Sequence, residues 1–422
     1  MSDIHCLPNQ LIQLTATNKS HRALLKGRGY LEGYLPPLPL ITTLAMDEEG
    51  ETVDSLEDFE TKWNKKQKGK STSEVGGVQW DDEAALKQQR AVVWQFAKKL
   101  GKNLFAAHDL TKIAFPVVLF ESDSYLQRVA SQIRYHPLYL TKAAEATSPV
   151  ERFKWVVVYV VAGLHLLETQ FRKPFNPILG ETYHCTYPDG SELFMEQSSH
   201  HPPISCWECH GLDDSYVYAG WSEFSAKFHG NNITADVVGP QNIYFKDGTY
   251  ITFSIPSVLV SGIAWGSRVM NYTGTFTVTD PKNNLSVKLT LNPKEGGMFS
   301  RKKCPPNTIR GDIMQADAKG KETRVSSVDG SWLGELSFDG EVYWRLEEQR
   351  KLSCAPTPGP GELLSDSRYR LDTYYLGQGD NDKAEEWKSK MEEDQRRDRK
   401  LRAGQKAAYE RMAARAKARS IG

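Results

Sequence analysis

The residues with the clearest chemical potential are two adjacent histidines, His200 and His201, in the octapeptide Glu-Gln-Ser-Ser-His-His-Pro-Pro at positions 196–203. Neighbouring residues of a regular strand point to opposite faces, and the prolines that follow cannot donate hydrogen bonds to a sheet. We therefore expect the chain to turn here and both imidazoles to emerge at the rim of a sheet. A polar surface turn without a ligand would explain the same residues.

A second polar group follows the predicted N-terminal helices. It reads Lys-Pro-Phe-Asn-Pro-Ile-Leu-Gly-Glu at positions 173–181, where Lys173 and Asn176 stand beside two prolines that fix the backbone. A third group lies on a predicted C-terminal helix, where Lys388, Glu392 and Arg396 are four residues apart. This spacing places the three side chains on one helix face. Salt bridges along a solvated helix are the alternative explanation of this third group.

Metal and enzyme chemistry find little support in the sequence. Cys206 and Cys209 have the spacing of half a zinc site, but a second pair of ligands is missing, and the two would point to opposite faces of a strand. The chain contains no Gly-x-Ser-x-Gly, Walker A, dinucleotide-binding glycine or His-Glu-x-x-His motif. We therefore predict that the protein is not an enzyme and that it uses no metal and no other cofactor.

The composition excludes several classes of protein. The 422 residues are 39% hydrophobic and 25% charged, which is ordinary for a globular chain. Lys and Arg (53) balance Asp and Glu (53), so no global field attracts nucleic acid or an anionic membrane. Six cysteines are too few for a disulfide scaffold, and the N-terminus does not read as a secretory signal. The apolar run at 155–167 is shorter than the roughly 20 residues that span a bilayer. We expect a soluble, cytosolic protein.

The secondary structure predicted around the polar groups changes along the chain, from a linker to helices and then to strands. Residues 51–80 mix charge with Gly and Ser and are expected to form a solvated linker. Helices are then predicted at 81–101, 124–146 and 149–170, and many short alternating segments follow up to about residue 348. These strands predict an antiparallel sandwich or barrel, and their aromatic content favours a barrel with a wide apolar interior.

The C-terminal region is predicted to be a Pro- and Gly-rich loop followed by a long polar helix over 382–418. From Arg396 to Arg419 this helix carries ten basic residues against two acidic ones. Such an excess suits contact with anionic lipid headgroups. A polar, solvated helix face is the alternative.

Taken together, the three polar groups resemble the motifs of the oxysterol-binding protein-related family of lipid transfer proteins. Residues 196–203 are similar to its Glu-Gln-x-Ser-His-His-Pro-Pro signature, and residues 173–181 to its Lys-Pro-x-Asn-Pro-x-Leu-Gly-Glu segment. The spacing of the third group is similar to the family's C-terminal helix motif, and residues 110–128 to its upstream helical segment. The resemblance covers roughly residues 85–400, which suggests a short member that consists of the lipid-binding domain.

The resemblance implies a mainly β fold with α additions: a large, incomplete antiparallel β-barrel around a hydrophobic lipid tunnel, with an N-terminal lid and a long C-terminal helix. The expected segments are 1–84 for lid and linker, 85–171 for helices, 172–354 for the barrel, and 355–422 for the C-terminal loop and helix. The expected lid residues are Tyr34, Leu35, Pro36, Pro37 and Leu38. The stretch 75–80 is the alternative lid.

The resemblance also implies a function, the exchange of phosphatidylinositol 4-phosphate against a second lipid, which is most often a sterol. The residues implied at the phosphoinositide headgroup are Lys173, Asn176, His200, His201, Lys388, Glu392 and Arg396. Phosphatidylserine is the alternative second lipid, and a lipid sensor that signals through a partner is the alternative function. We expect a monomer that binds no nucleic acid and contacts anionic membranes of the endoplasmic reticulum, Golgi or plasma membrane transiently.

Overall fold

The computed structural model describes residues 70–74, 76–100, 114–166, 172–295, 302–349, 352, 354–361 and 363–419. The chain divides into two units, Met1–Asp58 and Phe59–Gly422, and all of the described residues belong to the second. The expected lid at 34–38 lies outside the described residues.

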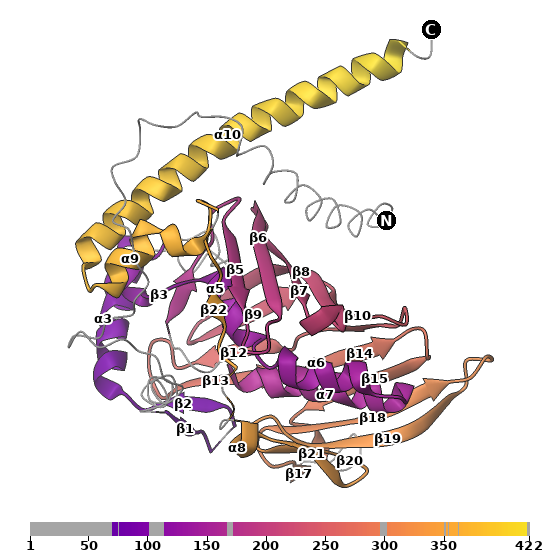
Figure 1. Cartoon of the computed structure of the whole chain (residues 1–422). Helices are drawn as coiled ribbons and strands as arrows, with labels where there is room; N and C mark the ends of the chain where they lie inside the picture. Colours follow the sequence, from indigo (N-terminus) through magenta and orange to yellow (C-terminus); the bar gives the residue numbers. More distant parts are fainter. Residues whose placement is uncertain are drawn as a thin grey trace. The chain divides into compact units, whose positions relative to one another are not determined.

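An antiparallel sheet of 18 described strands forms the centre of the fold (Figure 1). Four strands pair in chain order: β5 (Thr182–Thr186), β6 (Glu192–His200), β7 (Pro203–His210) and β8 (Tyr216–His229). The 14-residue strand β8 is the branch point of the sheet. Its first residues pair with β10 (Gln241–Phe245) and its last residues with β9 (Asn232–Val238).

Two arms of the sheet leave β8. The arm from β9 continues through β12 (Ser257–Ser261), β13 (Arg268–Thr273), β2 (Val78–Trp80) and β1 (Lys70–Thr72). The arm from β10 continues through β11 (Tyr250–Phe253), β14 (Thr275–Asp280), β15 (Leu285–Leu291), β18 (Thr308–Ala316), β19 (Glu322–Ser331), β20 (Glu335–Phe338) and β21 (Glu341–Arg345). On the other side, β22 (Thr357–Pro358) pairs with β5.

The barrel is incomplete, as predicted. Within the described ranges, no ladder joins β22 to the far strand of either arm, β1 or β21. Two small sheets lie apart from the main one: β3 (Phe120–Ser124) runs parallel to β4 (Lys173–Phe175), and β16 (Lys294–Glu295) pairs with β17 (Lys302–Lys303). The predicted mainly β architecture is therefore confirmed.

The predicted helices are confirmed with one exception. The helices are α3 (Glu83–Leu100), α5 (Tyr125–Gln132), α6 (His136–Glu145), α7 (Pro149–Leu164), α8 (Leu346–Gln349), α9 (Leu371–Gly377) and α10 (Asn381–Arg419), with 3-10 turns η2 (Val117–Leu119), η4 (Leu212–Asp214) and η5 (Ser367–Tyr369). The single helix expected at 124–146 is instead the pair α5 and α6. The chain breaks between them because Pro137, in the first turn of α6, disfavours helical backbone before it.

The expected linker at 51–80 is wrong over its last residues. Here β1 and β2 form a hairpin that joins the barrel through β13, and Val78 is buried in the main core. The glycines that suggested a linker make the turn: Gly77 has φ +83°, and a Cβ there would lie 2.2 Å from the carbonyl oxygen of Met270. An edge hairpin needs few apolar residues, so its composition resembles that of a linker.

Helix α7 is the apolar run that is too short to span a bilayer. Its residues from Val156 to Ala162 are all buried in the main core, as expected for a helix that is apolar on every side. The ring of Tyr159 lies 5.8 Å from that of Tyr218 and 6.1 Å from that of Phe253, so α7 packs where the β10 arm begins. No helix in the described part of the chain is long and apolar enough to cross a membrane.

Candidate functional site

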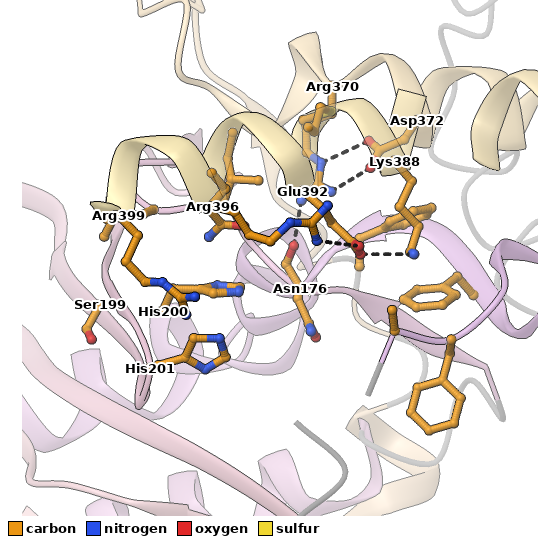
Figure 2. A pocket seen from close by; sticks show the side chains of 18 of the residues that line it. Asn176, Ser199, His200, His201, Arg370, Asp372, Lys388, Glu392, Arg396 and Arg399 are labelled. Atoms are coloured by element: carbon orange, nitrogen blue, oxygen red, sulfur yellow. Dashed lines mark hydrogen bonds and ion pairs between the residues drawn. The ribbon is translucent and has the colours of Figure 1, made fainter. Parts of the chain in front are cut away.

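A pocket of about 630 Å³ lies where α10 passes over the β6–β7 turn and the loop after β4 (Figure 2). Its walls contain six of the seven residues expected at the headgroup: Asn176, His200, His201, Lys388, Glu392 and Arg396. The three polar groups of the sequence therefore converge on one cavity, although they come from three separate segments of the chain.

Backbone hydrogen bonds explain why two of these groups meet. The Gly180 N–H donates to the carbonyl of Gln197, and the Gln197 N–H donates to the carbonyl of Glu181, both at 2.9 Å. The Ser205 hydroxyl donates to the Gln197 side chain at 2.6 Å, which joins the two strands that flank the histidine turn. The loop after β4 and the end of β6 are thus held against each other.

The seventh expected residue, Lys173, does not line the pocket but contacts a residue that does. Its ammonium donates to Asn176 Oδ1 and lies 4.7 Å from the centre of the Phe120 ring. Burial, together with the positive charges of Lys388 and Arg370, lowers the pKa of Lys173 to about 7. The ammonium of Lys173 is therefore only partly protonated at neutral pH, and a bound anion would favour its charged form.

On α10, Glu392 stands between two cations. Glu392 Oε1 lies 2.9 Å from Lys388 Nζ, and Glu392 Oε2 lies 3.9 Å from Arg396 Nη1. The Lys388 side chain is 7% exposed and that of Arg396 is 59% exposed, so one of the two cations beside Glu392 is buried and the other reaches solvent. This geometry allows Glu392 to orient the two basic side chains.

The two histidines stand at the other end of the pocket. Their rings are 4.5 Å apart and close to perpendicular, with an interplanar angle of 65°. His200 Nδ1 is buried and has no hydrogen-bond partner among the described residues. Burial and the neighbouring His201 lower the pKa of His200, so its ring is neutral at pH 7.

An ionic network that the sequence analysis missed forms part of the pocket wall. Arg370 Nη1 lies 2.8 Å from Glu181 Oε2, and Arg370 Nη2 lies 2.7 Å from Asp372 Oδ2, with all three side chains buried. Arg370 Nη1 also donates to the Asn176 carbonyl at 2.9 Å. Burial opposes the charge of Arg370, but the two carboxylates outweigh it and raise the pKa of this guanidinium. The network fixes the loop that carries Asn176.

Two further wall residues, Gln395 and Arg399, were not predicted. Gln395 Nε2 is buried without a hydrogen-bond partner in the described chain, and Figure 2 shows Arg399 beside Ser199 and His200. Both lie on the face of α10 that carries Glu392, at intervals of three and seven residues. Their helical spacing from Glu392 could have identified them in the sequence, but they lie outside the motif formed by Lys388, Glu392 and Arg396.

The charges of the pocket indicate an anionic ligand. Outside the neutralised Arg370 network, the described walls present three cations, Lys388, Arg396 and Arg399, against one carboxylate, Glu392. Donors of this kind that converge from several segments suit a phosphate ester, which accepts charge-assisted hydrogen bonds from a guanidinium fork, an ammonium and an imidazole. The aromatic rings of Phe120 and Phe175, 4.8 Å apart, form an apolar part of the same wall.

A metal site finds no support in the described part of the chain, which contains no group of three or more His, Cys, Asp and Glu residues placed to hold an ion. Cys209 is buried and Cys206 is partly exposed, as expected for residues on opposite faces of β7.

Comparisons with known proteins identify the family of the chain. The family model described as oxysterol-binding protein matches residues 92–362 and 357–415. Oxysterol-binding protein 9 of Dictyostelium discoideum is 38% identical over 339 residues, which cover 77% of this chain and 79% of that protein. Oxysterol-binding protein-related protein 5 of Mus musculus is 28% identical over 331 residues, 74% of this chain but only 36% of the relative.

Solved structures show the same fold. The Osh3 ORD of Saccharomyces cerevisiae, solved in complex with PI(4)P, matches with a TM-score of 0.59 and 25% identity, covering 73% of this chain and 84% of the other. The Osh1 ORD domain, solved with cholesterol, matches with a TM-score of 0.61 and 22% identity over 83% of this chain and 88% of the other.

Proposed function

The chain belongs to the oxysterol-binding protein family, most of it being the family's lipid-binding domain, and from this premise we propose that it exchanges phosphatidylinositol 4-phosphate against a second lipid between membranes. The observation that carries the proposal is the pocket, where an excess of cations and the two histidines line one cavity. The neighbouring Osh3 domain, solved with PI(4)P, supports the same ligand.

In this proposal the headgroup lies along α10. The phosphate accepts hydrogen bonds from the histidine pair and Arg396, and the remaining oxygens of the inositol ring and phosphodiester meet Lys388, Lys173 and Asn176. Glu392 keeps the two α10 cations apart and oriented, through contacts of 2.9 and 3.9 Å. Each charge-assisted hydrogen bond contributes about 1.5–3 kcal/mol, so several of them offset the loss of the headgroup's hydration.

We propose a sterol as the second lipid, bound in the barrel without use of the pocket, and phosphatidylserine as the alternative. The acyl chains of a lipid must leave a bilayer for an equally apolar cavity, because each buried CH₂ contributes about 0.8 kcal/mol. On this proposal the protein acts as a monomer without a catalytic step and visits membranes of the endoplasmic reticulum, Golgi or plasma membrane peripherally.

The test removes the histidine pair. We expect His200→Ala/His201→Ala to abolish extraction of phosphatidylinositol 4-phosphate from liposomes and to leave sterol binding intact. Transfer between two liposome populations, with phosphatidylinositol 4-phosphate in one of them, then separates exchange from mere sensing. His184→Ala is the matched control, since His184 lies on β5, contacts Glu192 at 3.2 Å and does not line the pocket.

Two outcomes would change the proposal. Phosphoinositide extraction that survives in the double variant would remove the pocket as its binding site. Suppose instead that the double variant loses phosphatidylinositol 4-phosphate and the second lipid together, with its circular dichroism spectrum unchanged. The second lipid would then also use the headgroup pocket, as phosphatidylserine would and a sterol would not.

A further inference from the structure

The loop between β12 and β13, residues 262–267, presents an exposed tryptophan beside a basic helix, and we propose that this surface docks the protein on anionic bilayers. We call residues 262–267 the tryptophan loop. The inference rests on the proposed lipid exchange, since it names the surface through which the protein would meet the membrane.

The tryptophan loop is held rigidly by side chains from other elements. Asn231 Oδ1 accepts the backbone N–H groups of Ala264 and Trp265 at 2.8 and 3.2 Å, and Asn231 Nδ2 donates to the Trp265 carbonyl at 2.9 Å. Arg268 donates to the carbonyls of Gly262 and Ile263 at 3.1 and 3.2 Å. Gly262 has φ +71°, and a Cβ there would lie 2.0 Å from the Ser267 carbonyl oxygen. The backbone of the loop is thus fixed while its largest side chain stays outside.

That side chain, Trp265, is 63% exposed, and a second tryptophan stands on the neighbouring helix. Arg90 of α3 donates to the carbonyls of Gly262 and Gly266, which joins α3 to the tryptophan loop. Trp94, one helical turn beyond Arg90 on the same face, is 52% exposed. Scattered exposed apolar residues are ordinary, but here two exposed tryptophans lie on a hydrogen-bonded loop and on the helix that contacts it, which favours a contact surface.

The charge of this surface indicates what it contacts. Arg90 and Arg268 have no carboxylate partner among the described residues, since their hydrogen bonds go to backbone carbonyls. Arg268 is buried, so the exposed charge of this surface comes from α3, where Lys87 and Lys98 lie at helical spacing from Arg90 and Trp94. The carboxylates of α3 are confined to its start, at Asp81, Asp82 and Glu83, and the sequence has no acidic residue between Ser254 and Thr279. Tryptophan prefers the boundary between headgroups and acyl chains, and basic side chains are attracted to anionic lipid.

Strand register places the tryptophan loop at the same end of the sheet as the pocket. The start of β7, just after the histidine turn, pairs with the later half of β8 through Ile204 and Glu223. Further along β8, Phe228 pairs with Ile233, which in turn pairs with Val260 near the end of β12. The histidine turn, the β8–β9 turn and the tryptophan loop therefore lie at one end, so a bilayer that binds Trp265 also lies toward the lipid headgroup site.

The test uses vesicles without phosphoinositide. We expect Trp265→Ala to weaken binding to phosphatidylcholine–phosphatidylserine vesicles by roughly tenfold or more in a flotation assay, because an indole loses its apolar contact. Tyr244→Ala is the matched control: Tyr244 is 40% exposed and pairs with Val217, at the opposite end of β8. Its vesicle binding should equal that of the unmodified protein.

Two further measurements keep docking separate from headgroup binding. Trp265→Ala should bind water-soluble, short-chain phosphatidylinositol 4-phosphate as the unmodified protein does, whereas His200→Ala/His201→Ala should show the reverse pattern. Bromolipid should quench tryptophan fluorescence in the unmodified protein and less in Trp265→Phe. The inference is overturned if Trp265→Ala floats like Tyr244→Ala, or if quenching in Trp265→Phe is unchanged.

Discussion

The pocket wall contains two groups of charged side chains, and the two groups differ in how completely their charges are paired. Arg370 is buried between two carboxylates at 2.8 and 2.7 Å, so its charge is fully neutralised by the protein. Elsewhere in the pocket wall, Lys388 and Arg396 contact Glu392, and Lys388 also lies 3.7 Å from Glu385, which does not line the pocket. Lys388, Arg396 and Arg399 thus face Glu392 as the one carboxylate of the described wall outside the Arg370 network. We call Arg370 with its two carboxylates the lower group, and these three cations with Glu392 the upper group. The lower group is complete in itself, and the upper group lacks the anions that would complete it.

The difference separates charges that shape the protein from charges that serve a ligand. A neutralised, buried network resists change, because removal of one member leaves an uncompensated charge away from water. An incompletely paired group of cations on a pocket wall is less stable by itself, and it is stabilised when an anion binds. The comparison also shows that burial alone does not define a site, since Arg370 and Lys388 are equally buried and differ in how their charges are paired.

The largest expected effect follows from removal of Arg370, the cation of the lower group. Arg370→Ala should reduce the free energy of unfolding by about 3–5 kcal/mol, because the buried carboxylates of Glu181 and Asp372 would lose the cation that balances their charge. Urea unfolding, followed by circular dichroism, measures this change. Arg396→Ala is the control and should cost less than about 1 kcal/mol, since its ion pair is exposed and long. Equal stability of the two variants would contradict the division into structural and ligand-binding charges.

The upper group is tested by ligand affinity instead. Lys388→Ala and Arg396→Ala should each weaken binding of phosphatidylinositol 4-phosphate by roughly ten- to a hundredfold, the loss of one charge-assisted bond. Lys388 should give the larger effect, since its side chain is 7% exposed and its charge is less screened than that of Arg396. Titration at fixed ionic strength measures both.

The control for this pair is Lys400→Ala, an exposed lysine on the same helix that does not line the pocket. It should reduce membrane association only slightly, in a salt-dependent manner, and leave ligand affinity unchanged. If all three variants behave alike, α10 is a solvated helix and Lys388 and Arg396 are not binding residues.

The sequence predicted the upper group better than the lower one for a physical reason. Lys388, Glu392 and Arg396 belong to a short local motif, and the resemblance of this motif to that of a known family identified them, whereas Arg399 lies outside the motif and was missed. The Arg370 network joins residues 189 positions apart through tertiary contacts, which leave no local pattern. The same reason explains the β1–β2 hairpin, whose pairing with β13 depends on a strand almost two hundred residues away.

The smallest expected effect concerns Lys173, which lies between the two groups and takes its pKa of about 7 from both burial and the nearby cations. A bound phosphate favours protonated Lys173, so binding takes up a proton above pH 7, and affinity should fall as the pH rises from 7 to 9. One pKa unit corresponds to about 1.36 kcal/mol, so the decrease can reach about tenfold per pH unit. The phosphate monoester itself is already doubly charged in this range, because its second pKa is about 6.

Isothermal titration with short-chain phosphatidylinositol 4-phosphate measures how affinity depends on pH. Lys173→Arg keeps its charge at pH 9 and should flatten the pH profile; a profile unchanged by that substitution would show that Lys173 does not titrate with the ligand.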